Sequence, residues 1–321
     1  MLDTYINPFT DFGFKRLFGE EPHKALLISF LNTLLPEKHQ IHDLHYTKNE
    51  YQGLSSIDRK AIFDLSCVSS KGERFIVELQ KAKQNYFKDR SLYYATFPIQ
   101  EQAIKGEWNF KLSAIYTVGI LDFVFDEDEQ AQDHEVVHTV QLKNQQNHVF
   151  YDKLTFIYIT LPHFNKTLAQ LTTLQDKWFY VFRHLQELED IPAVLQESIF
   201  LTLFEAAKIA CFTPVERQAY EDSLKYYRDL KNVTDTARDE GKVEGKIEGL
   251  EEGIAIGEER GIAIGVEKGI AIGVEKGEKR GEEKALRLMI ATMNSNGMTI
   301  AMIAKALSLD EAVVGRLLTP S

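Results

Sequence analysis

The chain has 321 residues, of which 44% are hydrophobic and 11% aromatic, and its formal net charge is −11. This composition is typical of a packed protein with one large core or two domains, and it excludes a disordered chain. The negative charge argues against nonspecific nucleic-acid binding through overall charge, so a nucleic-acid partner would have to meet a local basic patch. The two cysteines, Cys67 and Cys211, lack the spacing of a zinc site and are typical of a reducing cytoplasm.

No hydrophobic stretch of the sequence predicts a membrane span or a secretion signal. The most apolar run, residues 112–125, is too short to cross a bilayer and contains Ser113 and Asp122. The segment 1–19 lacks the uninterrupted apolar centre of a secretion signal. We therefore expect a cytoplasmic protein without a membrane partner.

Two helices are predicted near the start of the chain. Phenylalanine and leucine recur at near-helical spacing in FTDFGFKRLFG, residues 9–19, where Thr10 or Asp11 is available as an N-cap. Residues 24–35 form a second amphipathic pattern, which Pro36 ends. The chain is therefore expected to begin with helices.

A β-hairpin is predicted after a short strand at residues 41–46. Two apolar, β-rich runs, 62–68 and 74–79, flank a polar turn at 69–72. If the turn centres on Lys71, alternation places every second side chain on the same face. The apolar face is expected to carry Phe63, Leu65, Cys67, Val77 and Leu79. The polar face is expected to carry Asp64, Ser66, Glu78 and Gln80.

This register sets Asp64 directly opposite Glu78. Cross-strand neighbours lie roughly 4.5 to 5.5 Å apart at Cβ, where two like charges destabilise a sheet. A divalent cation between the carboxylates removes this cost, and Mg²⁺ takes one or two carboxylates while keeping several waters and room for a phosphate oxygen. The residues alone leave two interpretations open: a metal site for phosphodiester chemistry, and a pair of solvated charges on an exposed sheet face.

The chain between residues 87 and 232 mixes helical and strand patterns. Residues 87–107 predict a helix that Pro98 distorts or divides, and the run 112–125 predicts a buried strand. The acidic run 126–135 predicts a solvated loop. Further strands are predicted at 136–141 and 154–161, and helices throughout 165–190 and 192–232. The core is therefore predicted to be mixed α/β, with helices at both ends.

From Gly241 to Gly281 glycine occupies every fourth position. Glycine costs about 1 kcal/mol in a helix interior relative to alanine, so this pattern opposes a helix unless close packing compensates. Positions four apart drift by about 40° around a helix, so the glycines would form a slowly winding groove. Residues 236–284 are therefore predicted to be a helical oligomerisation stalk or a flexible linker, and the Ile-Ala-Ile triplets favour association.

The last region, 285–321, predicts a small helical hairpin. A helix is expected to end at residues 294–297, and the apolar spacing beyond it resembles half of a helix-turn-helix motif. The second helix carries Asp310 and Glu311 but only Arg316 as a cation. These charges favour a packing role over reading a DNA groove.

Three strings in this order resemble the PD-(D/E)XK nuclease superfamily, and more narrowly its Rpn family of recombination-promoting nucleases and transposases. They are FTDFGFKRLFG at 9–19, FDLSCVSSKGERFIVELQ at 63–80 and KDRSLYYATFPIQEQAIKGE at 88–107. The resemblance is close over roughly the first 125 residues. In the tail it is limited to the general features of helical segments and a glycine repeat. It implies a restriction-endonuclease-like domain over residues 1–235, with a central mixed sheet flanked by helices, followed by an all-helical C-terminal tail.

The resemblance also implies Mg²⁺-dependent cleavage of DNA, with Mn²⁺ or Ca²⁺ as substitutes. Asp64 matches the aspartate that bridges metal ions, and Glu78 matches the second metal ligand. The backbone carbonyl of Leu79 would complete the protein's share of the metal shell. Gln80 falls where the superfamily usually has a lysine, and it is assigned to orienting the attacking water.

The glutamine at position 80 is also a feature of the Rpn family, but it carries no charge. The electrostatic part of transition-state stabilisation must then come from another residue. Neighbouring candidates for this cation are Lys60, Lys81, Lys83 and Lys88, and the sequence does not distinguish them.

Further accessory residues are less specific. Asp11 is either an outer-shell carboxylate or simply the N-cap of the first helix, and the cap is the favoured interpretation. Lys15 and Arg90 are candidates for phosphate contacts, and each is equally well explained as a surface or packing residue.

The sequence therefore predicts a metal-dependent DNA endonuclease, with Asp64, Glu78 and Gln80 as catalytic residues and a role in DNA recombination or mobile-element activity. We expect DNA as a partner and a homo-oligomer formed through the glycine repeat. Two alternatives stay open: a catalytically inactive, oligomeric DNA-associated protein, and a transposase that joins strands by using a 3′-hydroxyl as nucleophile.

Overall fold

The chain divides into two compact units, one up to Ala237 and one from Arg238 onward. The computed structural model describes residues 3–51, 61–103, 109–131 and 134–319. Among the helices of these residues, no stretch is both long and apolar enough to cross a membrane. Each unit is described separately.

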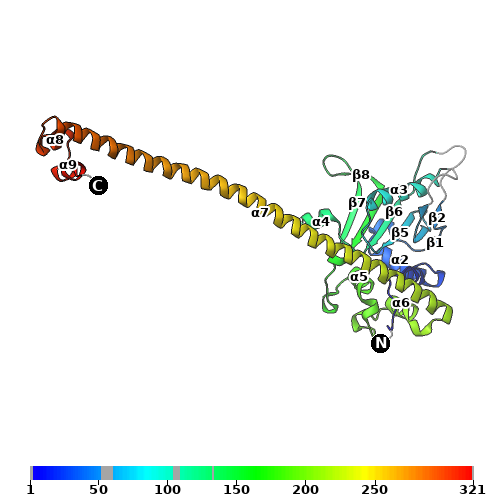
Figure 1. The fold of residues 1–321 in the computed structure, drawn as a ribbon. Coiled ribbons are helices and arrows are strands. Elements are labelled where there is room, and N and C mark those ends of the chain that lie inside the picture. Colours follow the sequence, from blue (N-terminus) through cyan, green and yellow to red (C-terminus); the bar gives the residue numbers. More distant parts are fainter. Residues whose placement is uncertain (1–2, 52–60, 104–108, 132–133, 320–321) are drawn as a thin grey trace. The chain divides into compact units, whose positions relative to one another are not determined.

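The centre of the first unit is a six-stranded mixed sheet in the order β1-β4-β5-β6-β8-β7 (Figure 1). Strands β5, β6 and β8 run parallel, whereas the pairs β1–β4, β4–β5 and β7–β8 are antiparallel. A separate two-stranded sheet joins β2 and β3. The strands are β1 (Leu44–Tyr46), β2 (Glu50–Tyr51), β3 (Ala61–Ile62), β4 (Leu65–Ser69), β5 (Arg74–Gln80), β6 (Ile115–Leu121), β7 (Val137–Lys143) and β8 (Val149–Thr160). The predicted mixed α/β class is confirmed.

Helices α2, α5 and α6 lie together on one side of this sheet (Figure 1). The helices are α1 (Asp11–Phe18), α2 (Lys24–Asn32), α3 (Phe87–Gln100), α4 (Asp126–Ala131), α5 (Leu174–His184), α6 (Ser198–Ala207), α7 (Pro214–Ser295), α8 (Ile300–Leu307) and α9 (Glu311–Leu318). The prediction of helix throughout 165–190 and 192–232 was wrong in part, because short 3-10 turns and extended segments separate α5, α6 and α7. Prolines at 192 and 214 mark two of these interruptions, since proline lacks the N–H that a continuing helix needs.

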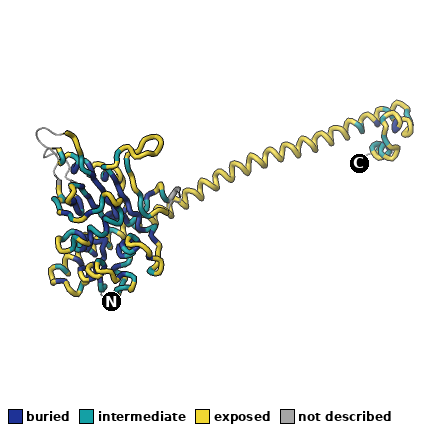
Figure 2. The backbone as a smooth tube through the Cα atoms, turned by 180° about the vertical axis from the view of Figure 1, so that it is seen from behind, coloured by how far each residue is buried: buried dark blue, intermediate teal, exposed yellow. Residues whose placement is uncertain are grey.

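The main hydrophobic core lies between the sheet and helices α1, α2, α5 and α6, where buried backbone gathers in Figure 2. Aromatic rings dominate it: the Phe18 ring stacks on Phe182 at 5.4 Å, and Phe30 meets Phe182 edge to face at 5.0 Å. Trp178 is fully buried beside them. Such ring pairs stabilise a core beyond the area that they bury. The phenylalanines predicted to line one face of the first helix therefore serve packing.

The cap of α1 is Thr10. Its Oγ1 accepts a hydrogen bond from the Gly13 N–H at 2.9 Å, as an N-cap does. Asp11 is the first helical residue and pairs with Lys15 at 2.9 Å on the surface. The favoured interpretation of Asp11 as the cap was therefore wrong.

The β4–β5 hairpin has the predicted register. Leu65 pairs with Val77 and Cys67 with Phe75, so the turn centres on Lys71. Gly72 has φ = +84°, a conformation that side-chain-bearing residues rarely adopt, which explains a glycine at this point of the turn.

One residue of the predicted apolar face was misplaced. Phe63 is buried with Ile76 and Phe97, beneath α3, and not in the main core that holds Leu65. The alternation fails here because β4 begins only at Leu65 and the chain bends at residue 64. The bend turns the Phe63 side chain to the α3 side of the sheet.

Helix α3 covers that second side of the sheet. Its Ala95 is fully buried, and its Phe87 meets Phe125 and Tyr158 in a smaller cluster. Pro98 lies inside the last turn of the helix without dividing it. The predicted helix therefore forms as one piece through Gln100.

The acidic run 126–135 was predicted to be a loop, but it begins with the short helix α4. Acidic side chains in a first turn are favourable because the helix N-terminus carries partial positive charge. Lys83 pairs with Asp126, and Lys88 with Glu127 at 3.1 Å, which holds α4 against the chain around α3.

At the far edge of the sheet, the ladder between β7 and β8 is irregular. The register shifts between Gln141 and Leu142 and again between Leu142 and Lys143. The extra residues lie on β8, because one step along β7 spans first four and then two residues of β8. Such irregularities interrupt the ladder of backbone hydrogen bonds between the two strands.

The first part of α7 packs on the first unit. Tyr220 accepts a hydrogen bond from the Asn7 N–H at 2.9 Å, and Ser223 accepts one from the Phe12 N–H at 3.2 Å. Tyr227 donates to Asp122 at the end of β6, at 3.1 Å. This part of α7 therefore lines the sheet edge at which β5 and β6 end.

The second unit contains the glycine repeat, which is helical throughout as part of α7. A Cβ added at any repeat glycine would meet no atom within 4 Å, apart from the helix's own nearby backbone. The predicted hairpin follows: Ile303 and Val314 of α8 and α9 are fully buried together with Ile290 of α7. Gly297, with φ = +88°, lies between α7 and α8.

Candidate active site

The predicted site residues meet at the sheet edge where β5 ends. Glu78 and Gln80 are the last alternate residues of β5, and Asp64 lies at the bend just before β4, which runs antiparallel to β5. Ligand sites of open α/β sheets lie characteristically beyond the carboxyl ends of strands.

A short hydrogen bond ties Asp64 to β5. The Leu79 N–H donates to Asp64 Oδ2 at 2.6 Å, because the bend has removed the backbone partner that β4 would otherwise supply. The N–H and C=O of one strand residue point toward the same neighbouring strand. The Leu79 carbonyl therefore faces the side on which Asp64 lies, as a shared metal shell would require.

Asn49 fixes the bend that presents Asp64. Its Nδ2 donates to the Asp64 carbonyl at 3.0 Å, and its Oδ1 accepts from the Ser66 N–H at 3.2 Å. The Asn49 carbonyl accepts from the Phe63 N–H at 2.8 Å. One residue thus satisfies the backbone on both sides of Asp64. Nothing in the local sequence pattern pointed to this role, because Asn49 is 15 positions away from Asp64.

Glu78 is the unusual group of the site. The residue as a whole keeps some contact with solvent, but its Oε1 is completely buried and has no hydrogen-bond partner among the described residues. Burial, followed by the charge of Asp64, raises the pKa of Glu78 to about 8. Burial also raises the pKa of Asp64, and the Leu79 N–H opposes that shift. Two neighbouring carboxyl groups that are shielded from solvent cannot both stay ionised unless a cation compensates their charge; otherwise one of them is protonated.

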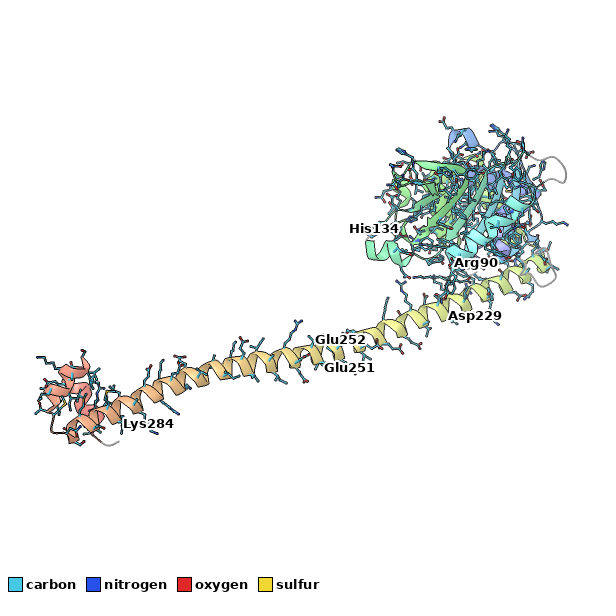
Figure 3. The ribbon with its side chains drawn as sticks, turned by 90° about the horizontal axis from the view of Figure 1, so that it is seen from above. Arg90, His134, Asp229, Glu251, Glu252 and Lys284 are labelled. Carbon is cyan, nitrogen blue, oxygen red and sulfur yellow. The ribbon has the colours of Figure 1, made fainter. Side chains whose placement is uncertain are left out.

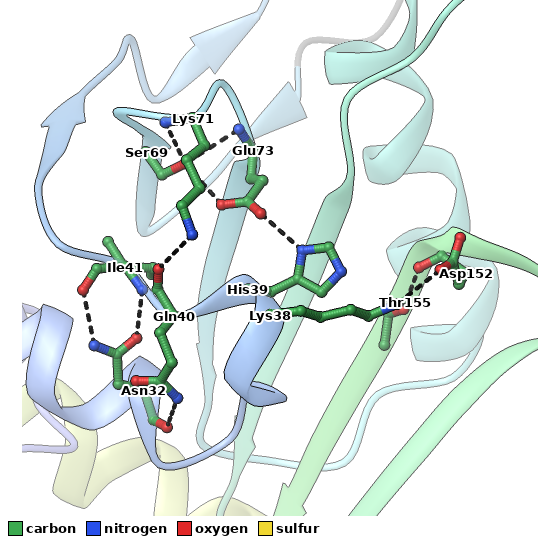
Figure 4. Close-up of polar contacts among 10 residues, drawn as sticks. All are labelled: Asn32, Lys38, His39, Gln40, Ile41, Ser69, Lys71, Glu73, Asp152 and Thr155. Atoms are coloured by element: carbon green, nitrogen blue, oxygen red, sulfur yellow. Dashed lines mark hydrogen bonds and ion pairs between the residues drawn. The ribbon is translucent and has the colours of Figure 1, made fainter.

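A second buried glutamate shows the contrast. Glu73, just before β5, is 6% exposed, and both its oxygens are satisfied: His39 Nδ1 lies 2.7 Å from Oε1, and Ser69 Oγ donates to Oε2 at 2.9 Å (Figure 4). This glutamate is built into the fold around the hairpin turn. Glu78 is satisfied at one oxygen only. The Asp64 backbone hydrogen-bonds its carboxyl group, whereas Oε1 has no partner among the described residues, which is the property of a group kept for a ligand.

The donor set fits a hard divalent cation. Mg²⁺ uses one or two carboxylates and otherwise keeps water or substrate oxygens. Asp64, Glu78 and the Leu79 carbonyl offer such a set, and the unpartnered Oε1 is an available ligand atom. In the described part of the chain, no group of three or more Asp, Glu, His and Cys side chains is arranged for a metal ion.

Gln80 is buried, and both ends of its amide are engaged. Its Nε2 donates to the Ala82 carbonyl at 2.8 Å, and its Oε1 accepts from Arg90 Nη2 at 2.5 Å. Arg90 lies on α3, whose position on the first unit is visible in Figure 3. The structure therefore brings Arg90 directly to Gln80.

Three further charged residues lie near Asp64: Asp11, Lys15 and Lys81. Their charges act on Asp64: Asp11 raises its pKa, and the two lysines lower it. Lys81 Nζ lies 5.7 Å from the centre of the Tyr226 ring, and burial lowers its pKa. Lys60 lies outside the described residues.

Asp122 is a further carboxylate at this edge that the sequence analysis did not select. Its N–H donates to the Gln80 carbonyl at 3.0 Å, but its side chain accepts from Tyr227 on α7. Burial raises the pKa of Asp122, and the nearby Lys231 opposes that shift. Asp122 therefore connects α7 to the sheet edge and is turned away from Gln80.

A family model described as PD-(D/E)XK nuclease family transposase matches residues 8–237. The match spans α1, the β4–β5 hairpin, α3 and the first part of α7. No curated protein and no solved structure matches the chain at a significant level.

Proposed function

Because this chain belongs to the PD-(D/E)XK nuclease family of transposases, we propose that it is a Mg²⁺-dependent DNA endonuclease that hydrolyses phosphodiester bonds. The observation that supports this most directly is the buried, unpartnered Oε1 of Glu78 beside Asp64. A solvated pair of surface charges would not leave a carboxylate oxygen dry and unpaired. We further propose that cleavage promotes DNA recombination or mobile-element activity.

Each residue of the site has a defined task in this proposal. Asp64 and Glu78 hold the cation, and the Leu79 carbonyl faces the same place. A bound Mg²⁺ supplies a water of lowered pKa and neutralises charge on the departing oxygen. Asn49 keeps Asp64 in place, and the Leu79 N–H keeps the Asp64 carboxylate oriented.

Plasmid cleavage tests the proposal. We expect the purified protein to nick or cut supercoiled DNA with Mg²⁺, Mn²⁺ or Ca²⁺, and EDTA to stop the reaction. Asp64→Ala should abolish cleavage, whereas Asp152→Ala, which removes an exposed carboxylate paired with Lys38, should not change it. Equal cleavage by the wild type and Asp64→Ala would exclude this site, and absence of cleavage by a folded wild type would favour the inactive DNA-associated alternative.

The family description also favours strand transfer as a second candidate. The same carboxylates would then hold the ion while a 3′-hydroxyl, in place of water, attacks the phosphorus. A labelled oligonucleotide with a free 3′-end distinguishes the two reactions, because strand transfer yields a joined product that is longer than either substrate.

For the tail we propose self-association through residues 236–284 and a packing role for residues 285–321. Exposed apolar side chains along the helical repeat, such as Ile262, Ile264, Ile270 and Ile272, support association. Equilibrium sedimentation of the protein with and without residues 238–285 tests it, and an unchanged number of copies per particle would contradict it. We propose a cytoplasmic location for the assembled protein.

A further inference from the structure

The proposed chemistry lacks an assigned positive charge at position 80. A lysine there would place an ammonium at the reacting phosphate, whereas Gln80 is neutral. The Gln80 amide is engaged at both ends, by the Ala82 carbonyl and by Arg90. Its most direct structural role is therefore to hold Arg90.

Arg90 is held on several sides. Besides its bond to Gln80, Nη1 donates to Gln84 Oε1. The guanidinium carbon lies 5.5 Å from the centre of the Phe87 ring and 5.9 Å from that of Tyr94, within the range of cation–π attraction. A planar guanidinium has five N–H donors, and these two bonds leave others for a phosphate. The group is thus positioned before any substrate arrives.

The charge of Arg90 reaches the carboxylates. Its cation acts on Glu78, where it favours the ionised form against the effect of burial. Every second side chain of β5 points to the same face, so Ile76, Glu78 and Gln80 share one face. Ile76 packs beneath α3 and Gln80 bonds Arg90 of α3, so Glu78 and Arg90 both lie on the side of the sheet that α3 covers. The guanidinium therefore lies beside the place where the ion and the phosphate would meet.

The other described candidates have different partners. Lys83 and Lys88 pair with Asp126 and Glu127 of α4. Lys81, which follows Gln80 in the chain, has its Nζ 5.7 Å from the centre of the Tyr226 ring, and its charge also reaches Asp64. Arg90 differs from it in that its guanidinium hydrogen-bonds Gln80 directly and its charge acts on Glu78.

We infer that Arg90, positioned by Gln80, supplies the positive charge that a lysine at position 80 would otherwise bring to the scissile phosphate. Arg90 contacts the non-bridging phosphate oxygens, and Gln80 is a positioning residue. A guanidinium suits this task because it stays charged and binds phosphate oxygens in a planar, bidentate manner. The inference rests on the proposed nuclease function and adds the residue that stabilises its transition state.

A charge-swap series tests the inference. Arg90→Ala should lower kcat for plasmid nicking about 100-fold, the range for loss of one transition-state donor, while KM changes less than about threefold. Gln80→Lys should also be impaired, because its ammonium faces Arg90. The double variant Gln80→Lys/Arg90→Ala should nick at least about tenfold faster than Arg90→Ala, because it restores one cation at that place. Lys88→Ala, which removes a cation from the same helix, should resemble the wild type.

A second measurement does not depend on cleavage. Removing a cation beside Asp64 and Glu78 should tighten Mn²⁺ binding by about three- to tenfold in Arg90→Ala, measured by calorimetry without DNA, and should leave Lys88→Ala unchanged. Urea unfolding checks that each variant is folded. Arg90→Ala with wild-type nicking, a double variant no faster than Arg90→Ala, or unchanged Mn²⁺ affinity in Arg90→Ala would each overturn the inference. If the folded wild type itself does not nick plasmid DNA, the nuclease proposal is refuted instead. The Mn²⁺ titration would then still test whether the charge of Arg90 acts on Asp64 and Glu78.

Discussion

Replacing Glu78 with glutamine should stabilise the metal-free protein while removing its response to divalent cations. The buried Oε1 of Glu78 has no partner among the described residues, and burial together with Asp64 raises the pKa of Glu78 to about 8. Glutamine keeps the shape of the side chain but carries no charge. It therefore avoids the cost of ionising a carboxyl group in this place.

Proton linkage gives the size of the effect. A glutamate in the unfolded chain ionises near pH 4.5, whereas the folded protein keeps the proton on Glu78 until about pH 8. The stability contributed by the protonated group is fully present below pH 4.5 and is lost as the pH rises toward 8. At about 1.4 kcal/mol per pH unit, the upper limit of the loss between pH 5 and pH 8 is about 4 kcal/mol. Since Glu78 keeps some contact with solvent, screening reduces the expected value to about 2 kcal/mol.

The assay is urea unfolding in EDTA at pH 5 and pH 8. The free energy of unfolding of Glu78→Gln, relative to the wild type, should rise by about 2 kcal/mol between these pH values. Glu73→Gln is the matched control, because Glu73 is also buried but is hydrogen-bonded at both oxygens. It should lose about 1 to 3 kcal/mol of stability. Mn²⁺ at pH 8 should stabilise the wild type and not Glu78→Gln.

A specific result would refute this reasoning. If Glu78→Gln is no more stable than the wild type at pH 8 in EDTA, and both proteins lose stability in parallel from pH 5 to pH 8, then Glu78 does not carry the cost assigned to it. Its unpartnered oxygen would then be no evidence for a cation site.

Two further changes have defined outcomes. Asn49→Ala removes the hydrogen-bond partners of the Asp64 carbonyl and the Ser66 N–H. Urea unfolding should therefore show a loss of about 1 to 2 kcal/mol in the free energy of unfolding, and the rate of plasmid nicking should fall as well. Unaltered stability and nicking would contradict the role of Asn49 in holding the bend. Gly265→Ala adds a methyl group where no atom lies within 4 Å. At low protein concentration the helix should gain about 1 kcal/mol of stability per site, measured by thermal unfolding followed through the helical signal, while sedimentation should show weaker self-association. Gly297→Ala, at φ = +88°, should be destabilised instead, and tighter self-association of Gly265→Ala would contradict the glycine groove.

Elements set by local chemistry could be predicted from the sequence. The hairpin register followed from the polar turn and the alternation around Lys71, and the first helix from the spacing of its phenylalanines. The buried strand at β6 followed from its continuous apolar run. In each case, neighbours within a few positions carry the signal.

Features that depend on distant residues could not be predicted. The bend at Asp64 exists because Asn49, from an earlier segment, holds the backbone there, and it moves Phe63 to the other side of the sheet. Gln80 and Arg90 are ten positions apart on a strand and a helix, so only their tertiary packing shows that they meet. Helix α4 forms where the acidic run suggested a loop, because lysines from the α3 region pair with its first turn. The catalytic role of Asp64 and Glu78 and the positioning role of Gln80 stay predictions for the assays above.

The two edges of the six-stranded sheet have a consequence for how copies of this protein meet. β1, at one edge, has only three residues, whereas β7, at the other, runs through seven residues. A short edge strand is a poor template for pairing with a strand of another chain, which is the usual route to sheet-mediated aggregation. If the tail gathers copies as proposed, the β1 edge is therefore protected against fusion with a second sheet, and β7 is the edge at which such pairing would have to occur.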